Sequence, residues 1–113
     1  MEYNKGFINA LKESIREFDF ETCCSLYKFL DWEVFTPELG RLGFPSEESI
    51  RNIIISLANG AYKSFIESGE LTFHYSAGIK VTVWQYEKGH EDYIEEYDGF
   101  KVLIEFIAVD SES

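Results

Sequence analysis

The spacing of the apolar residues changes at Gly69, and this change constrains the fold more than any other feature of the sequence. Between Ser46 and Gly69, apolar residues recur at spacings of three and four, which is typical of a helix that buries one face. From Leu71 onward, apolar and polar residues alternate, which is typical of β-strands. Helical and strand patterns occupy separate parts of the chain, so the sequence predicts an α+β fold and argues against a parallel α/β sheet.

The segment from Ser46 to Gly69 contains the signals for the beginning and the end of one long helix. Ser46 is expected to be the N-cap residue, and Gly69 can adopt the left-handed conformation that ends a helix. Glu47 and Glu48 would lie at the positive end of the helix dipole. The predicted apolar stripe consists of Ile50, Ile53, Ile54, Leu57, Ala58, Ala61, Tyr62, Phe65 and Ile66. Such a helix is roughly 30 Å long and can cover a small sheet.

Two further helices are predicted before this one. The first runs from Asn4, a plausible N-cap residue, to Phe18. The second runs from about Phe20 to Asp31, and periodicity leaves open whether the two are separate or form one kinked helix. The side chains expected to face inward are Phe7, Ile8, Leu11, Ile15 and Phe18 on the first helix and Cys23, Leu26, Tyr27 and Leu30 on the second.

Antiparallel strands are predicted after Gly69. Ser76-Ala77-Gly78 permits a tight turn between two alternating segments. In the first, Leu71, Phe73 and Tyr75 alternate with Thr72 and His74, and in the second, Ile79, Val81 and Val83 alternate with Lys80, Thr82 and Trp84. Asp98-Gly99 predicts a two-residue hairpin turn that pairs the segment Tyr93–Tyr97 with a last strand beginning at Phe100.

We therefore expect a single α+β domain over residues 1–113, with a helical part in residues 1–69 and an antiparallel sheet in residues 70–113. In this arrangement the N-terminal helices and one long central helix pack on a three- or four-stranded antiparallel sheet. The 45% of apolar residues is enough to form a core without disulfides.

The chain is strongly acidic, with 21 Asp and Glu against 10 Lys and Arg and a net charge of −11. Such a field repels nucleic acid and anionic membranes and attracts basic partners. We expect a protein partner with a basic surface, no direct contact with nucleic acid and no contact with membrane; the alternative is that the charge only keeps the protein in solution. The sequence also lacks a signal peptide and an apolar stretch of about 18 residues, which predicts a cytoplasmic protein.

No recognisable catalytic set is present. Cys23 and Cys24 are adjacent and have no second pair, and His74 and His90 have no second ligand at metal-binding spacing. Phosphate-binding loops, dinucleotide fingerprints and nucleophile elbows are absent from the sequence. We expect a non-enzymatic protein without a metal or cofactor. The alternative is an enzyme or small-ligand binder, which a deep polar pocket around His74 or Arg41 would indicate.

An acidic run interleaved with aromatic residues follows the predicted second strand. Carboxylates on a rigid hairpin can occupy a basic groove as phosphates do, while aromatic neighbours supply contact area. This pattern predicts a partner-binding surface, with a solvated charged loop as the alternative. The candidate residues are Trp84, Glu87, Glu91, Asp92, Tyr93, Glu95, Glu96, Tyr97 and Asp98.

The aromatic segment Trp32–Pro45 is the alternative partner-binding region. It contains both prolines and is expected to be an ordered loop or a short extended piece. Trp and Arg are favoured anchors at interfaces; the other interpretation is that the segment seals one end of the core. The candidate residues are Trp32, Phe35, Arg41 and Phe44.

A homodimer is also expected. Large side chains on the last strands lie on the face opposite Val81, Val83, Ile104 and Phe106, and such a patch rarely stays exposed on a monomer. The residues concerned are Trp84, Tyr86, Leu103, Ile107 and Val109.

Four short strings resemble a group of small uncharacterised proteins carried by phages and prophages of Gram-positive bacteria. They are Leu30–Thr36, Phe44–Ile50, Ser76–Val81 and Leu103–Ile107, and the resemblance covers roughly Leu30 to Val109. It implies a phage accessory role in the cytoplasm of an infected or lysogenic bacterial host, such as an anti-defence inhibitor that binds a host defence protein or another nucleic-acid-binding protein. It carries over no catalytic residues. A structural or housekeeping module of a phage or mobile element is the alternative role.

Overall fold

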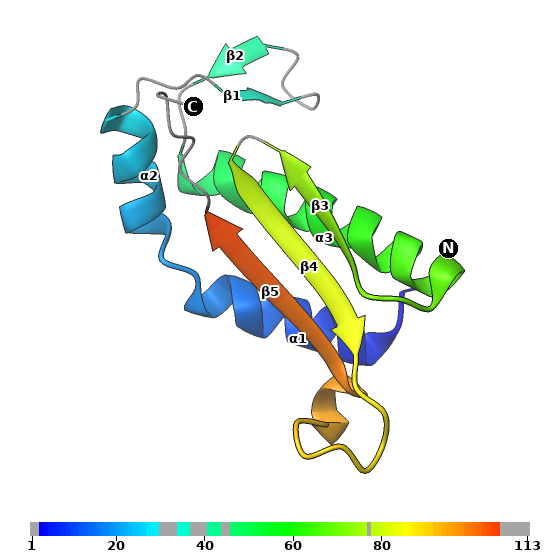
Figure 1. Ribbon diagram of the computed structural model, residues 1–113. Helices are drawn as coiled ribbons and strands as arrows, with labels where there is room; N and C mark the ends of the chain where they lie inside the picture. The colour runs from blue at the N-terminus through cyan, green and yellow to red at the C-terminus, as the bar shows by residue number, and fades with distance from the viewer. Residues whose placement is uncertain (1–2, 30–33, 37–40, 44–45, 77, 107–113) are drawn as a thin grey trace, which may run out of the picture.

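The computed structural model describes residues 3–29, 34–36, 41–43, 46–76 and 78–106. The elements are α1 (Lys5–Glu17), α2 (Phe20–Phe29), β1 (Val34–Thr36), β2 (Arg41–Gly43), α3 (Glu47–Ser68), β3 (Thr72–Ser76), β4 (Ile79–Gln85), the 3₁₀ helix η1 (Glu95–Tyr97) and β5 (Phe100–Phe106). Strands β3, β4 and β5 form an antiparallel sheet in that order. Figure 1 shows α1 and α3 on one face of this sheet, while no described helix covers the other face. The predicted α+β fold is confirmed.

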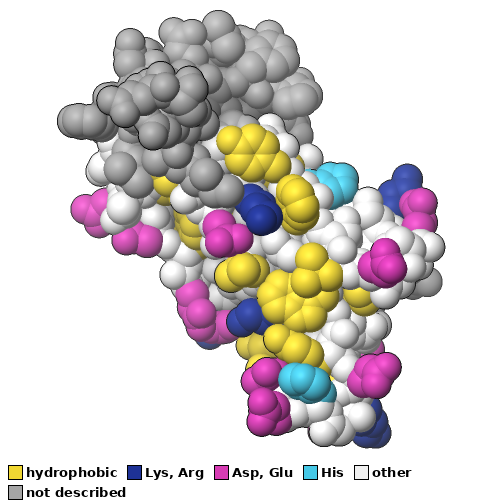
Figure 2. All heavy atoms as spheres, viewed as in Figure 1, with side chains coloured by type: hydrophobic (Ala, Val, Ile, Leu, Met, Phe, Trp, Pro, Cys, Tyr) yellow, Lys and Arg dark blue, Asp and Glu magenta, His cyan; other side chains and the backbone are white. Residues whose placement is uncertain are grey.

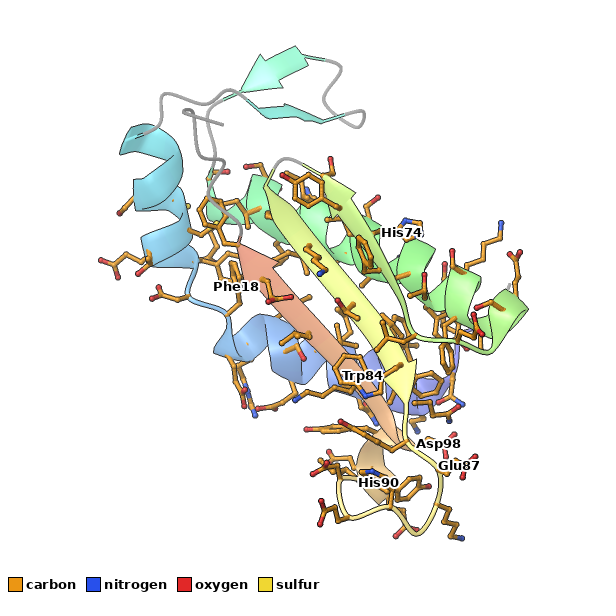
Figure 3. All side chains as sticks on the ribbon, in the orientation of Figure 1. Phe18, His74, Trp84, Glu87, His90 and Asp98 are labelled. Carbon is orange, nitrogen blue, oxygen red and sulfur yellow. The ribbon has the colours of Figure 1, made fainter. Side chains whose placement is uncertain are left out.

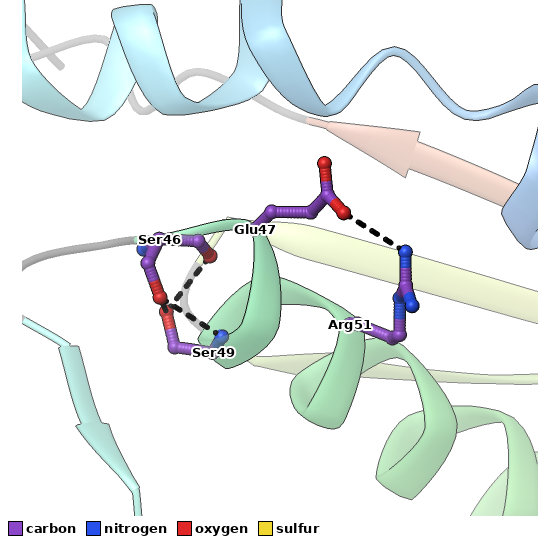
Figure 4. A network of polar contacts seen from close by, with 4 residues as sticks. All are labelled: Ser46, Glu47, Ser49 and Arg51. Carbon is purple, nitrogen blue, oxygen red and sulfur yellow. Dashed lines mark hydrogen bonds and ion pairs between the residues drawn. The ribbon is translucent and has the colours of Figure 1, made fainter.

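Helix α3 begins and ends at the predicted residues. The Ser46 side chain accepts a hydrogen bond from the Ser49 amide at 3.2 Å, and the Ser49 hydroxyl accepts one from the Ser46 amide at 2.8 Å (Figure 4). This reciprocal pair satisfies two amides that have no partner within the helix. Glu47 forms an ion pair with Arg51 one turn later. At the other end Gly69 has a φ of 75° and donates its amide to the Phe65 carbonyl at 2.7 Å.

The predicted apolar stripe of α3 faces the sheet along most of its length. Ile50, Ile54, Ala58 and Ala61 are fully buried. The prediction is wrong for Ile66, which is 49% exposed. In Figure 1 the last turn of α3 projects past the edge strand β3, so this turn has no strand beneath it.

Helices α1 and α2 are separate, which settles the question that periodicity left open. Asn4 caps α1 by accepting hydrogen bonds from the amides of Gly6 and Phe7. The backbone at Phe18 is extended, and Asp19 then accepts from the amide and the hydroxyl of Thr22 in the first turn of α2. Cys23 of α2 is buried in the core, as predicted; the side chains of Leu26 and Tyr27 and residues 30–31 lie outside the described part.

The register of the sheet determines which side chains face the helices. Ser76 pairs with Ile79, so Ile79, Val81 and Val83 share the inner face with Thr72 and His74. The larger apolar residues of β3 are therefore on the outer face: Leu71, Phe73 and Tyr75 are 60%, 54% and 48% exposed. A shift of one residue would exchange the two faces. The central strand β4 buries Ile79, Val81 and Val83 against the helices, so its inner face is fixed. Because β3 and β5 both pair with β4, their registers follow from it.

The core joins α1, α2, α3 and the inner face of the sheet. Phe7 is fully buried at its centre, with its ring 4.3 Å from that of Tyr62 and 5.9 Å from that of Phe100. Buried side chains from all three helices and from β4 and β5 belong to this cluster. Among the described helices none is long and apolar enough to span a membrane.

The predicted hairpin at Asp98-Gly99 is wrong. Strands β4 and β5 pair directly from Ile79↔Phe106 to Gln85↔Phe100 and are joined by residues 86–99. Residues 93–97 are not a strand, because the amides of Tyr97 and Asp98 bond locally to the carbonyls of Ile94 and Glu95 and form η1. The turn signal itself is real, since Asp98 and Gly99 both have positive φ, but it connects η1 to β5.

The described residues of the aromatic segment form two short antiparallel strands, in agreement with the prediction of an ordered loop or a short extended piece. Strands β1 and β2 pair from Val34↔Gly43 to Thr36↔Arg41. Phe35 and Arg41 belong to these strands, and their side chains are outside the described part, as are residues 32 and 44.

We expect the substitution Gly60→Ala to have opposite effects in two backgrounds. A Cβ at Gly60 would lie 2.7 Å from Nδ1 of His74, whose ring rests on α3 and whose Nε2 is 3.2 Å from the Ser64 hydroxyl. In the wild-type chain the clash should outweigh the gain in helix propensity and cost about 1 kcal/mol. In a His74→Ala background the same substitution should stabilise by up to about 1 kcal/mol. Urea unfolding of the four proteins measures both values, and equal effects in the two backgrounds would contradict this packing.

Candidate partner-binding surface

Residues 86–99, which we call the acidic loop, form an ordered connection between β4 and β5. The amide of His90 bonds to the Glu87 carbonyl and the amide of Tyr93 bonds to the His90 carbonyl, so two turns precede η1. Gly99 donates to the Ile94 carbonyl at 3.1 Å across η1. Together with the left-handed conformation of Asp98, this bond closes the end of the short helix as in a Schellman motif.

The acidic loop is anchored to the N-terminal half of α1. Asn9 donates from Nδ2 to the Glu96 carbonyl at 3.2 Å, and Asn4 donates from Nδ2 to Oδ2 of Asp98 at 3.1 Å. Gly6 is buried, and a Cβ at that position would lie 2.5 Å from the backbone of Tyr97. The helix and the loop are therefore in backbone contact, which holds the loop in one place relative to the sheet.

One of the six candidate carboxylates stabilises the loop itself. Asp98 accepts hydrogen bonds from Asn4 and from the Tyr93 hydroxyl, and its own carbonyl accepts from Gln85 at 2.8 Å. Partial burial, the nearby Asp98 charge and this hydrogen bond raise the pKa of Tyr93. Asp98 and Tyr93 thus stabilise the loop through bonds within this chain, and their predicted contact with a partner stays a prediction.

The other five carboxylates point into solvent. Glu87, Glu91, Asp92, Glu95 and Glu96 are all exposed. Among the described residues, none of them forms an ion pair with Lys or Arg. Nδ1 of His90 lies 3.9 Å from Oδ2 of Asp92 and accepts a hydrogen bond from the Asp92 amide at 3.0 Å. In Figure 3, Glu87, His90 and Asp98 lie together at the end of the sheet below Trp84.

A groove lies between the acidic loop and the C-terminal half of α1 and brings further charged side chains beside the loop. It has a volume of about 410 Å³ and is lined by side chains from α1, the loop and β5. Its charged lining consists of Glu13 and Glu17 of α1, Asp92 of the loop and Lys101 of β5, and Glu13 is also paired with Arg16. Sequence reasoning missed the two glutamates, because they lie far from the loop in the chain. Their spacing of four residues on one helical face was the only available signal.

Tyr97 also lines the groove, and the charges around the groove shift its pKa. Partial burial raises the pKa of Tyr97 most, and the carboxylates of Glu13, Glu96 and Glu17 raise it further, while Arg16 acts in the opposite direction. Tyr97 also packs on the core beside Gly6 and is half-buried, so only part of its ring is available for the predicted contact with a partner.

Other aromatic and apolar side chains are available beside the carboxylates. The Tyr86 ring stacks on His90 at 4.6 Å and meets Trp84 edge-on at 6.0 Å. Ile94 is 49% exposed within the acidic loop, although the sequence pattern did not single it out. Figure 2 shows yellow side chains continuing from the sheet toward the loop, with acidic side chains around them.

The groups considered for enzymatic chemistry do not converge. Burial and nearby charges raise the pKa of the Cys23 thiol to about 12, so it is protonated at neutral pH and is a poor nucleophile. His74 lies between β3 and α3 with Ser64, remote from the acidic loop. Within the described residues, no group of three or more His, Cys, Asp or Glu is placed to hold a metal ion.

Comparisons with known proteins found no matching family model, no similar curated protein and no similar solved structure. Functional inference therefore depends on the geometry and charge of the surface.

Proposed function

We propose that this chain is a non-enzymatic binding protein whose acidic loop docks on a basic surface of a partner protein and inhibits it. The observation that supports this proposal is the set of five exposed carboxylates on a loop anchored to α1, without Lys or Arg partners among the described residues. Like charges held close together repel one another, and a cationic surface would relieve that repulsion on association.

Anchoring of the loop favours this function. A preorganised surface loses little conformational entropy on binding, so more of the interaction free energy appears as affinity. Asn4, Asn9 and Gly6 hold the loop through contacts that do not involve the five exposed carboxylates. The binding groups are thus separable from the groups that maintain the loop, which makes the proposal testable by substitution.

The partner expected from this chemistry carries a groove or patch of Lys and Arg that normally meets phosphates. Nucleic-acid-binding proteins have such surfaces. The resemblance to phage and prophage proteins suggests a bacterial host and a component of a host defence system as the inhibited protein. Ile94, Tyr86 and Trp84 are the apolar contacts adjacent to the carboxylates.

Neutralising four loop carboxylates should abolish capture of the partner. We expect the variant Glu91→Gln, Asp92→Asn, Glu95→Gln and Glu96→Gln to fold normally, because all four side chains are exposed. A matched control removes four exposed charges elsewhere: Glu21→Gln, Glu48→Gln, Glu67→Gln and Glu70→Gln. Quantitative mass spectrometry of proteins captured from a bacterial host lysate compares the two with the wild type.

The proposal predicts a protein that the wild type and the control enrich and that the loop variant loses by at least about tenfold. Equal losses in both variants would mean that only net charge matters. Capture that is unchanged in the loop variant would reject the acidic loop and leave the aromatic segment containing Phe35 and Arg41 as the alternative.

A further inference from the structure

The outer face of the sheet is arranged so that it is complementary to itself. Register places Phe73, Thr82 and Leu103 side by side in a middle row across β3, β4 and β5. Two residues along the strands in one direction, the next row on this face pairs Trp84 with Lys101. Two residues in the other direction, the next row pairs Lys80 with Glu105. The face thus has a middle row in which Phe73 and Leu103 flank the buried Thr82, between two rows that each carry Lys.

The exposed apolar area on this face fits an interface. Leu71, Phe73, Tyr75 and Leu103 are 60%, 54%, 48% and 39% exposed, which corresponds to roughly 400 Å² if a fully exposed large side chain contributes about 150–250 Å². With the partly exposed Trp84 and the lysine stems, the face offers roughly 600 Å², and two such faces would bury about 1,200 Å², the lower end of the range for specific interfaces.

The charge of the face differs from that of the rest of the chain. It carries Lys80 and Lys101 against Glu105, an excess of one positive charge on a chain whose net charge is −11. The ammonium of Lys80 lies over the Phe73 ring at 4.6 Å. Figure 2 shows dark-blue side chains among the yellow ones on this face. Two chains that repel each other elsewhere would meet with least repulsion here.

We propose that a second copy of this chain covers the face, with the two sheets packed face to face about a two-fold axis. The axis lies between the sheets, perpendicular to the strands, at the level of Thr82 and Leu103. Each middle row then packs on its copy. The row with Trp84 and Lys101 meets the partner's row with Lys80 and Glu105, which places Lys101 opposite Glu105 and Lys80 over Trp84, twice per dimer.

This dimer does not depend on the proposed function, and salt separates the two. Its interface is largely apolar and joins two acidic chains, so added salt screens their repulsion and should strengthen it. Binding of a basic partner to the acidic loop should weaken under the same change.

A charge exchange tests the pairing. The variant Lys101→Glu should be monomeric, because position 101 of one chain and Glu105 of the other would then both be negative. The variant Glu105→Lys should also be monomeric, because Lys101 of one chain would then meet a lysine at position 105 of the other. An equimolar mixture should form a heterodimer, because the introduced glutamate of one chain then meets the introduced lysine of the other. Their net charges are −13 and −9, since each substitution changes −11 by two, so long-range attraction cannot explain the mixing.

Light scattering at about 100 µM and native mass spectrometry give the outcome. Wild type should have a mass of about 26 kDa, twice 13.1 kDa, and the mixture should recover it. A wild type of about 13 kDa at several hundred µM in 0.5 M salt overturns the dimer. Single variants that dimerise as the wild type does overturn this arrangement of it.

A second pair of variants tests the face without using charge pairing. Leu103→Glu should give a monomer, whereas Ile55→Glu on α3, a site of similar exposure away from the face, should remain a dimer. Circular dichroism verifies that both fold. If the wild type is monomeric at every concentration and Leu103→Glu loses a protein captured by the wild type, the face belongs to that protein and the proposal is wrong.

Discussion

Replacing Phe7 by alanine is expected to lower the free energy of unfolding by about 3–5 kcal/mol. The Phe7 side chain is fully buried, stacks on Tyr62 at 4.3 Å and meets the Phe100 ring edge-on. These rings come from α1, α3 and β5, so the cavity would open where three elements join. Since a chain of this size has a total stability of about 5–15 kcal/mol, the substitution removes a large share of it. Urea unfolding at 25 °C measures the change.

The matched control is Phe73→Ala on the outer face of the sheet. Phe73 is 54% exposed, so in the monomer its removal should cost much less, about 0.5 kcal/mol or a little more for the lost contact with Lys80. Dilute protein is needed, because self-association would add to the measured value. Similar decreases in the free energy of unfolding for the two substitutions would mean that Phe73 is buried, which would contradict the assignment of the outer face.

Replacing Gly6 by alanine is expected to displace the acidic loop from α1. The new Cβ would lie 2.5 Å from the Tyr97 backbone and 2.6 Å from the Cβ of Asp98, and backbone cannot rotate away as a flexible side chain can. Overpacking of this kind costs about 1–3 kcal/mol. We also expect the amides of Tyr97 and Asp98, which are bonded within η1, to exchange with deuterium faster.

Gly89→Ala is the control for this substitution. Gly89 lies in the same loop with a φ of 102°, and a Cβ there meets no atom within 4 Å. It should cost roughly 1 kcal/mol through backbone strain and leave amide exchange near η1 unchanged. If Gly6→Ala leaves both stability and exchange at their wild-type values, the loop is not held by its contact with α1.

The elements with strong local signals were predictable from the sequence. Asn4, Ser46 and Gly69 cap their helices as expected, because capping depends on residues within one turn of the helix end. The alternation in β4 likewise gave the correct inner face, since Ile79, Val81 and Val83 are all fully buried.

The features that sequence reasoning missed depend on contacts between distant segments. Local turn chemistry at Asp98-Gly99 was correctly recognised, but nothing in the string shows that β4 already occupies the edge of β5 with which residues 93–97 were expected to pair. The exposed position of Phe73 follows from the hairpin register, which depends on the better burial of β4. The periodicity of a single strand predicts neither which strand it pairs with nor the register of that pairing.

The candidate surface was predictable in charge and not in geometry. A run of carboxylates is visible in the sequence, whereas the contributions of Glu13 and Glu17 arise only when α1 packs beside the loop. Loop-stabilising roles of Asp98 and Tyr93 are hidden for the same reason, because Asn4 lies at the other end of the chain.

The association rate constant of the captured partner, measured against salt concentration, tests the central claim most directly. At 0.1 M salt the Debye length is about 10 Å, so charges near the contact accelerate association and distant ones contribute little. We predict that the four-carboxylate loop variant associates at least about tenfold more slowly than the wild type, with a weaker dependence on salt, while the control with four distant substitutions stays close to the wild type. Equal rate constants for the wild type and the loop variant at low salt would contradict the claim that the acidic loop is the binding surface.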